Sequence, residues 1–210
     1  TTAPTVSSVS SSASDGAYKP NDNITVSVTF NDNVIVDNSS GQPRIQLETG
    51  TNDRYANYIS GSSTSVLSFL YLVQPGDNSS DLDYKATNSL SLNSGSIRDN
   101  ATNDATLTLP SPGATGSLGI NKSIVIDSIV PTVSSITPAD DQGGISITDN
   151  VSVTVSESMD TTSVTTNTSN TTCSGTLLVS SDNFSSCVQM SSSPTISNSN
   201  KTFTLDPYDN

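Results

Sequence analysis

The amino-acid sequence predicts an all-β protein made of two tandem antiparallel β-sandwiches, and three observations support this fold class. Apolar and small polar residues alternate in short segments such as 24–30 and 151–155, which is the period-2 pattern of strands with one buried face. Apolar residues at the helical period of 3.6 are hard to find anywhere in the chain. The phrase PTVSS occurs twice, at 4–8 and 131–135, and a repeated element indicates a repeated module.

The two copies align beyond this phrase. Pro4 and Pro131 each precede an aspartate by 18 residues, so the segment DNITVSV falls on DNVSVTV without a gap. The next landmarks, VTFNDNV and VTVSESM, match best after a slip of two residues, which keeps every side chain on its own face of the sheet. We therefore expect one module in residues 1–128 and a second in residues 129–210, with almost no linker and hence a fairly stiff connection.

Turn residues such as Gly, Pro, Asn, Asp and Ser separate the predicted strands. In the first module these strands are Thr5–Ser11, Ile24–Phe30, Arg44–Glu48, Tyr55–Ile59, Val66–Val73, Tyr84–Leu92, Thr106–Leu109 and Lys122–Asp127. In the second they are Thr132–Ile136, Asn150–Ser156, Thr176–Ser180, Val188–Met190 and Lys201–Leu205. A sandwich of this type needs about seven strands, so the second module is expected to lack its closing strands. Either those strands follow further along, or a neighbouring chain supplies one by β-augmentation, for example from the N-terminal TTAPTVSSV of another copy.

The charge balance excludes two classes of partner. The net charge is −13, with only 7 basic residues, and such a surface repels nucleic acid and anionic membranes. No segment approaches the length of a membrane-spanning helix, so we expect no membrane insertion. The N-terminal TTAPT carries no signal-peptide pattern and is typical of a linker.

Cys173 and Cys187 are the two cysteines. An even number at hairpin spacing, in an acidic chain rich in Ser, Thr and Asn, predicts a disulfide and an oxidising, extracellular compartment. The alternative is a pair of free thiols. A zinc site would need more ligands than two thiolates can supply.

Calcium is the metal that the aspartates favour. Ca²⁺ takes six to eight oxygen ligands, and loops that offer carboxylates and carbonyls can supply them. The predicted ligands come from the runs DNSSDLD and RDNATND and from the end of the last strand of the first module: Asp77, Asp81, Asp83, Asp99, Asp104 and Asp127. A junction site is a second arrangement, in which Asp127 joins Asp15 or Asp99 and Asp140 or Asp141. The alternative interpretation is that these are solvated turn residues.

Catalytic chemistry has little support. The chain has no histidine, which removes the commonest general base and every Ser-His-Asp or Cys-His arrangement. Two aspartates could form a glycosidase pair, but aromatic residues make up 5% of the chain and tryptophan is absent, which leaves little to stack on a sugar ring. We therefore expect no enzyme activity.

The motifs resemble those of known repeats. The segments APTVSSV, DNITVSVTFNDNV and SLGINKSIVID resemble the long Ig-like and cadherin-like repeats of large bacterial surface proteins. The segment PTVSSITPADD, followed by DNVSVTVSESMD, is similar to the bacterial Ig-like domain of S-layer proteins, although Val155 stands where that family has Phe. The resemblance implies Ig-like sandwiches in a secreted, cell-surface array that serve as spacers, adhesive units or lattice elements, with calcium frequent between modules. It implies neighbouring modules as the partners. The alternative is a subunit of an extracellular filament, completed by a strand from a neighbouring chain.

Overall fold

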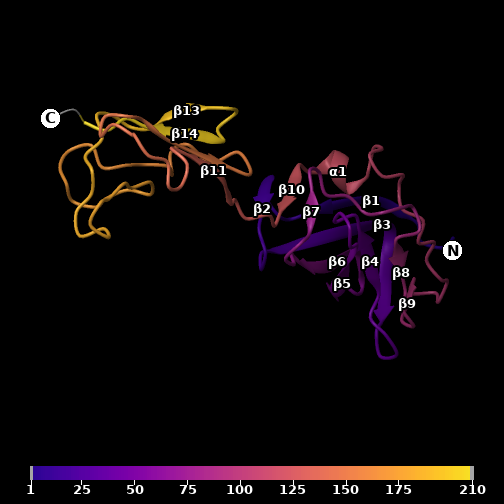
Figure 1. Cartoon of the computed structure of the whole chain (residues 1–210). Helices are drawn as coiled ribbons and strands as arrows, with labels where there is room; N and C mark the ends of the chain where they lie inside the picture. The colour runs from indigo at the N-terminus through magenta and orange to yellow at the C-terminus, as the bar shows by residue number, and fades with distance from the viewer. Residues whose placement is uncertain (1, 209–210) are drawn as a thin grey trace. The chain divides into compact units, whose positions relative to one another are not determined.

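The computed structural model describes residues 2–208, and the chain divides into two compact units, residues 1–129 and 130–210. Fourteen β-strands and one helix of four residues account for the regular structure of the described residues. Nearly all strand pairs are antiparallel, which confirms the predicted all-β class. Each unit is described separately below (Figure 1).

The main sheet of the first unit has the strand order β1-β3-β6-β5-β4-β8, and a seventh strand, β9, pairs with β3. These strands are β1 (Val6–Ser11), β3 (Asn23–Asp37), β4 (Arg44–Leu47), β5 (Arg54–Ser60), β6 (Thr64–Leu72), β8 (Leu90–Ser91) and β9 (Ser96–Arg98). The alternation seen in the sequence is the reason for this layer, because in β3 every second residue from Ile24 to Phe30 is buried. One face of the sheet therefore packs in the core and the other carries small polar residues.

A smaller sheet forms the second layer of the first unit. Its strands are β2 (Gly16–Tyr18), β7 (Asn78–Ser79) and β10 (Ile124–Asp127), in the order β2-β10-β7. The β2–β10 pair is parallel, with Ile124 opposite Gly16 and Ile126 opposite Tyr18. Together with the parallel bridge between Thr5 and Thr106, it departs from the expected antiparallel pairing. Ile124 and Ile126 are buried between the layers, in one continuous core with residues of β3 and β6.

One short helix interrupts the all-β pattern. This helix, α1 (Leu118–Asn121), begins at Ser117, whose side chain accepts a hydrogen bond from the Ile120 amide at 3.3 Å. Such an N-cap satisfies one of the amides that a helix start leaves without a partner. Leu118 is fully buried, so the helix fixes the chain against the core just before β10.

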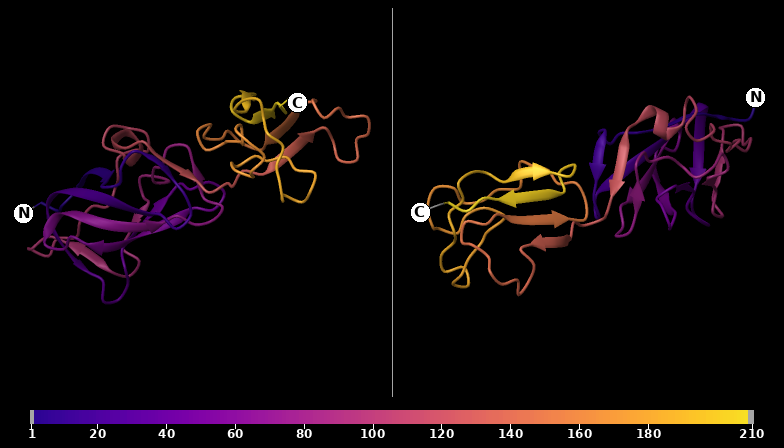
Figure 2. Two further views of the ribbon diagram at one scale, coloured as in Figure 1. Left: turned by 90° about the vertical axis from the view of Figure 1, so that its left-hand side faces the viewer. Right: turned by 45° about the horizontal axis from the view of Figure 1, so that its top comes forward.

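The second unit contains one sheet of four strands among its described residues, in the order β11-β12-β14-β13. Its strands are β11 (Val133–Thr137), β12 (Val151–Val155), β13 (Thr195–Ser197) and β14 (Thr202–Leu205). Figure 2 shows them side by side in its right-hand view, with β11 at one edge. On one face Val153, Phe203 and Leu205 are buried. On the other face hydroxyl groups pair across the strands, as in the Ser152–Thr204 contact of 2.9 Å.

The internal repeat is confirmed by the backbone. The turn at 19–22 holds two hydrogen bonds, from the Lys19 amide to the Asp22 carboxylate (2.9 Å) and from the Asp22 amide to the Lys19 carbonyl (3.1 Å). Ser146 and Asp149 make the same two bonds at 2.9 and 3.1 Å. The turns at 19–22 and 146–149 are therefore equivalent, as the gapless alignment of the two copies predicts.

The strands after this turn follow the slipped alignment. A register shift lies between Val6 and Ser8 in β1, and the equivalent shift lies between Val133 and Ser135 in β11. Across the sheet Val6 pairs with Phe30, whereas Val133 pairs with Val155. The two-residue slip between the two aligned copies therefore falls at the start of β3 and its counterpart β12. As a result, Val155 occupies the position of Phe30.

Several predicted strands are wrong, and the backbone pairing gives the reason. Most of the segment 84–92 is irregular: Leu90 and Ser91 pair with β4, and Tyr84 adds an isolated bridge to Leu47 of the same strand. The segment 106–109 contributes a single bridge, Thr106 to Thr5. In the second unit the segments 176–180 and 188–190 form no strand, and β13 was not predicted. Short apolar runs show that residues are buried, but they do not show whether a neighbouring strand is present to pair with.

Candidate functional site

Asp77 was predicted as a calcium ligand, and in the structure its carboxylate lies inside the first unit. It is fully buried and accepts hydrogen bonds from Arg54 Nε (2.7 Å), the Tyr71 hydroxyl (2.7 Å) and the Gln74 amide (2.9 Å). Burial, followed by the hydrogen bond to this carboxylate, raises the pKa of Tyr71 far above its ordinary value. The network ties the end of β6 to the loop that follows and to β5. Asp77 therefore stabilises the fold, because its oxygens are already satisfied by protein donors.

Asp81 and Asp83 are the pair of predicted ligands that the fold brings together. A methyl group placed on Gly119 would lie 3.1 Å from Asp83 Oδ2 and 3.4 Å from Asp81 Oδ2, so both carboxylates face the same point of α1. Asp83 accepts hydrogen bonds from the Tyr84 and Gly113 amides, at 2.9 and 3.0 Å. Burial raises the pKa of Asp81, and the charge of Asp83 raises it further. A cation held between the two carboxylates would relieve this repulsion.

The remaining predicted ligands in the RDNATND segment are used locally. Asp99 closes its own loop, because its carboxylate accepts hydrogen bonds from the Ala101 and Asn103 amides, both at 2.8 Å, and from the Asn103 side chain at 2.7 Å. These bonds lower the pKa of Asp99. Asp104 forms an exposed ion pair with Arg98, at 2.6 Å between Nε and Oδ1. Neither carboxylate approaches the Asp81–Asp83 pair closely enough to form a metal-binding group within residues 2–208.

Asp127 lies at the end of β10, opposite Asn78 of β7. Its carboxylate accepts a hydrogen bond from the Ile129 amide at 3.1 Å, so it caps the end of this strand. Asp15, the possible junction ligand from the first unit, pairs instead with Lys122 at 3.1 Å. Across residues 2–208 the structure contains no group of three or more acidic or cysteine side chains that could hold a metal ion.

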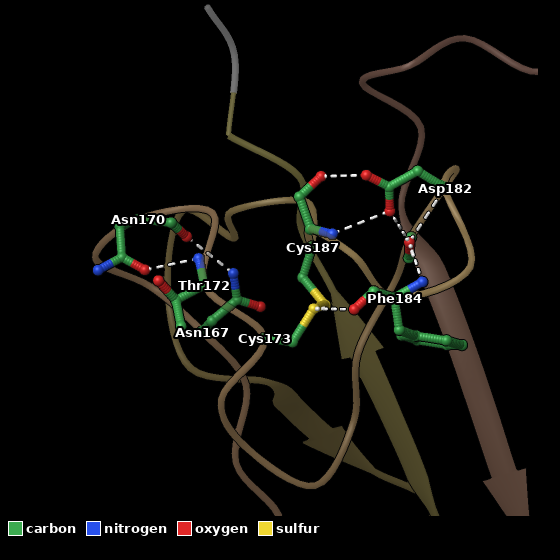
Figure 3. Close-up of a disulfide and its surroundings, with 9 residues drawn as sticks. Asn167, Asn170, Thr172, Cys173, Asp182, Phe184 and Cys187 are labelled. Atoms are coloured by element: carbon green, nitrogen blue, oxygen red, sulfur yellow. Dashed lines mark hydrogen bonds between the residues drawn. A yellow bond between two sulfur atoms is a disulfide. The ribbon is translucent and has the colours of Figure 1, made fainter.

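The disulfide is present in the second unit. Cys173 and Cys187 are bonded, with their Cα atoms 5.0 Å apart, and they close a loop of irregular structure (Figure 3). Asp182 organises the same loop, because it accepts hydrogen bonds from the Ser186 amide (2.9 Å), the Ser186 hydroxyl (2.6 Å) and the Ser180 hydroxyl (2.8 Å). These bonds lower the pKa of Asp182 to about 2. The loop therefore has two independent constraints, the disulfide and the hydrogen bonds to the Asp182 carboxylate.

The sheet of the second unit has an uncovered edge that sequence reasoning did not locate. Every residue of β11 is exposed, including Val133 (59%) and Ile136 (52%). An open groove of about 710 Å³ runs beside this strand and is lined by Ser135, Ile136, Pro138, Ala139, Asp140, Asp141 and Gln142. The sequence predicted a strand at 132–136, but its pattern does not show which side of that strand is covered.

A second apolar hollow lies on the buried face of the same sheet. Its volume is about 290 Å³, and it is lined mostly by apolar side chains, among them Val153, Met159, Leu177 and Phe203. The irregular segment that carries the disulfide covers this face only in part. The second unit therefore has one complete layer and an incomplete second layer among its described residues.

Comparison with known proteins gives one positive result. Residues 127–210 match the family described as the bacterial Ig-like domain, which is the family that the VSVTVSESMD segment resembles. No curated protein and no solved structure matches the chain. Domains of this family occur in bacterial surface proteins and are generally structural rather than catalytic. Within residues 2–208, no helix is long and apolar enough to cross a membrane.

Proposed function

We propose that this chain is a non-catalytic structural and adhesive part of a secreted bacterial cell-surface protein. The match of residues 127–210 to the bacterial Ig-like domain is the observation that carries the proposal. The internal repeat supports it, because the same turn and the same register shift occur in both units. Modules of one design, joined in series, are suited to spacing or lattice formation.

The pattern of polar contacts also supports a structural role. Most of the predicted ligand carboxylates are used to close loops or to anchor strand ends, as Asp77 and Asp99 show. The disulfide is typical of proteins that work in an oxidising environment. The decisive experiment is to apply antibodies raised against the folded chain to intact cells that express the protein. Binding that protease treatment of the cells abolishes supports the proposal, whereas signal only after cell lysis contradicts it.

We further propose that calcium stiffens the first unit at Asp81 and Asp83. No hydrogen bond from the described residues reaches the Asp81 carboxylate, and backbone oxygens or water would have to complete the six to eight ligands of Ca²⁺. Melting curves with millimolar Ca²⁺ and with a chelator test this. Binding to the folded state raises the melting temperature, and Asp81→Asn should remove that rise whereas Asp104→Asn should not. An unchanged melting temperature contradicts calcium binding and leaves the structural role intact.

A second candidate function is a subunit of an extracellular filament in which the second unit is completed by a strand from a neighbouring chain. The exposure of all of β11 favours it, because an edge strand with exposed apolar residues tends to pair with another chain. The donor is not the N-terminal strand of another copy in this conformation, since β1 is paired with β3 and Val9 is fully buried. Electron microscopy of the purified chain with its natural partners tests for detergent-stable polymers.

A further inference from the structure

We propose that the outer face of β5 and β6 in the first unit binds a carboxylated sugar, with Arg44 as the group that recognises the carboxylate. The inference rests on the adhesive part of the proposed function and deepens it, because it names the chemical class of a ligand and the place that holds it. The site lies on the solvent side of the main sheet, opposite to the core.

A hollow of about 320 Å³ lies on this outer face, within the range of about 300–1,000 Å³ that is usual for small-ligand pockets. Side chains of β5, β6 and the turn after β6 line it, among them Tyr55, Asn57, Ile59, Leu70, Leu72 and Gln74. Tyr55, Ile59 and Leu72 are 38%, 50% and 44% exposed. The neighbouring β3 instead carries small polar residues on this face, such as Thr25 opposite Leu70. The outer apolar surface is therefore gathered on β5 and β6.

The charge around the hollow differs from that of the whole chain. The chain has a net charge of −13 and 20 acidic residues, yet none of the described residues that line the hollow is acidic. Arg54 lines it, and the buried Asp77 behind Arg54 is paired with it at 2.7 Å. Asp53, just before β5, is paired with Lys85. An anion can therefore approach this face without meeting unpaired negative charge.

Arg44 supplies a positive charge that is free to bind an anion. It lies opposite Asn57 in the β4–β5 pair, so both side chains are on the outer face. Its Cζ lies 3.9 Å from the centroid of the Tyr55 ring. Its Nε is enclosed, and no hydrogen bond or ion pair from residues 2–208 reaches the guanidinium. The ring holds the planar guanidinium in place, and its two terminal nitrogens can donate parallel hydrogen bonds to a carboxylate.

The remaining side chains favour a sugar over a peptide as the carrier of the carboxylate. Both β5 and β6 are interior strands that are paired on each side, so this face offers no free backbone edge to a peptide strand. Binding must therefore use side chains. The amides of Asn57 and Gln74 can bond to hydroxyl groups, and Tyr55 and Leu72 present apolar surface to the carbon face of a ring. Composition alone could not place this tyrosine beside an unpaired arginine.

The test measures binding of the whole chain to two carboxylated sugars, trigalacturonic acid and sialyllactose, by titration calorimetry in calcium-free buffer. The methyl ester of each sugar is the matched probe, because it keeps the ring and the hydroxyl groups but lacks the charge. At least one acid should bind saturably, and its ester should bind about tenfold more weakly or worse. Added salt should weaken binding of the acid.

Substitutions locate the site. Arg44→Gln should weaken binding of the acid about tenfold, because it removes the donors to the carboxylate. Arg98→Gln is the matched control, since Arg98 is an exposed arginine that is paired with Asp104, and it should leave the affinity unchanged. Tyr55→Phe keeps the ring under Arg44 and should retain binding. Tyr55→Ala removes the ring and should weaken binding.

Three results would overturn the proposal: neither acid binds, the esters bind as well as the acids, or Arg44→Gln and Arg98→Gln have equal effects. Binding of a glutamate-rich peptide in place of either sugar would also contradict it. Each of these results leaves the structural role and the surface location untouched. Antibody binding only after cell lysis would contradict the proposed function itself, whichever sugar the purified chain binds.

Discussion

Val9 and Ile136 occupy equivalent positions in the two units, one residue beyond the same register shift and opposite Val28 and Val153 respectively. Val9 is 0% exposed and Ile136 is 52% exposed. The difference arises from the segment that contains α1 and β10, which covers β1 in the first unit and has no counterpart at β11 among the described residues. The stability of each unit should therefore depend on this segment, or on a substitute for it.

Leu118→Ala should destabilise the first unit by about 2–5 kcal/mol, because it removes a fully buried leucine and leaves a cavity. Urea unfolding followed by tyrosine fluorescence reports on this unit, since five of the 6 tyrosines lie in it. The control is Ile120→Ala in the same helix, where the side chain is 58% exposed and the change should stay within about 0.5 kcal/mol. Equal effects of the two substitutions would show that α1 does not anchor the segment that covers β1.

Tyr71→Phe should cost about 1–3 kcal/mol, because the buried Asp77 carboxylate loses one of its three donors. Tyr18→Phe is the control. Its hydroxyl also donates at 2.7 Å, to the Ser14 carbonyl, but at the surface, where water can replace it. Urea unfolding measures both changes. A Tyr71→Phe protein as stable as the Tyr18→Phe protein would mean that Arg54 and the Gln74 amide satisfy Asp77 without Tyr71.

The sequence allows the all-β class, the repeat and the disulfide to be predicted, because each depends on local pattern or spacing. Alternation in 24–30 gives the buried face of β3 directly. The irregular path of 84–92 could not be predicted, since its apolar residues are buried by distant strands rather than by a ladder of their own. Of the predicted calcium ligands, Asp81 and Asp83 could be placed near each other from their spacing. The enclosure of Asp77 by Arg54 and Tyr71 depends on tertiary contacts that no spacing shows.

Asp182 should titrate with a pKa of about 2, below its ordinary value of 3.8. Because the folded state lowers this pKa, the carboxylate stabilises its loop fully above pH 4, and this contribution is lost as the pH falls from about 4 to 2. NMR titration of the side-chain carboxyl carbon gives the value. Ser186→Ala removes the hydroxyl that donates at 2.6 Å and should raise the pKa. A pKa near 4 in the wild type would contradict the hydrogen-bond network.

Replacement of Cys173 and Cys187 by alanine should lower the stability of the second unit by roughly 3 kcal/mol, since the disulfide closes a loop of about 15 residues. The first unit should be unaffected. Hydrogen exchange that resolves β12 and β14 separately from β3 and β6 measures both effects. Wild type treated with a reducing agent is the matched control and should behave like the double variant. A uniform loss of protection in both units would contradict the independence of the two cores.

The most direct test of the account compares backbone hydrogen exchange at Val9 and Ile136 in the 210-residue chain. The Val9 amide is bonded to the Gly116 carbonyl at 2.7 Å, so it should exchange only when the first unit opens. The Ile136 amide has no such partner among the described residues, so it should exchange rapidly. Strong protection of Ile136 would contradict the claim that the second unit presents an open edge in this chain.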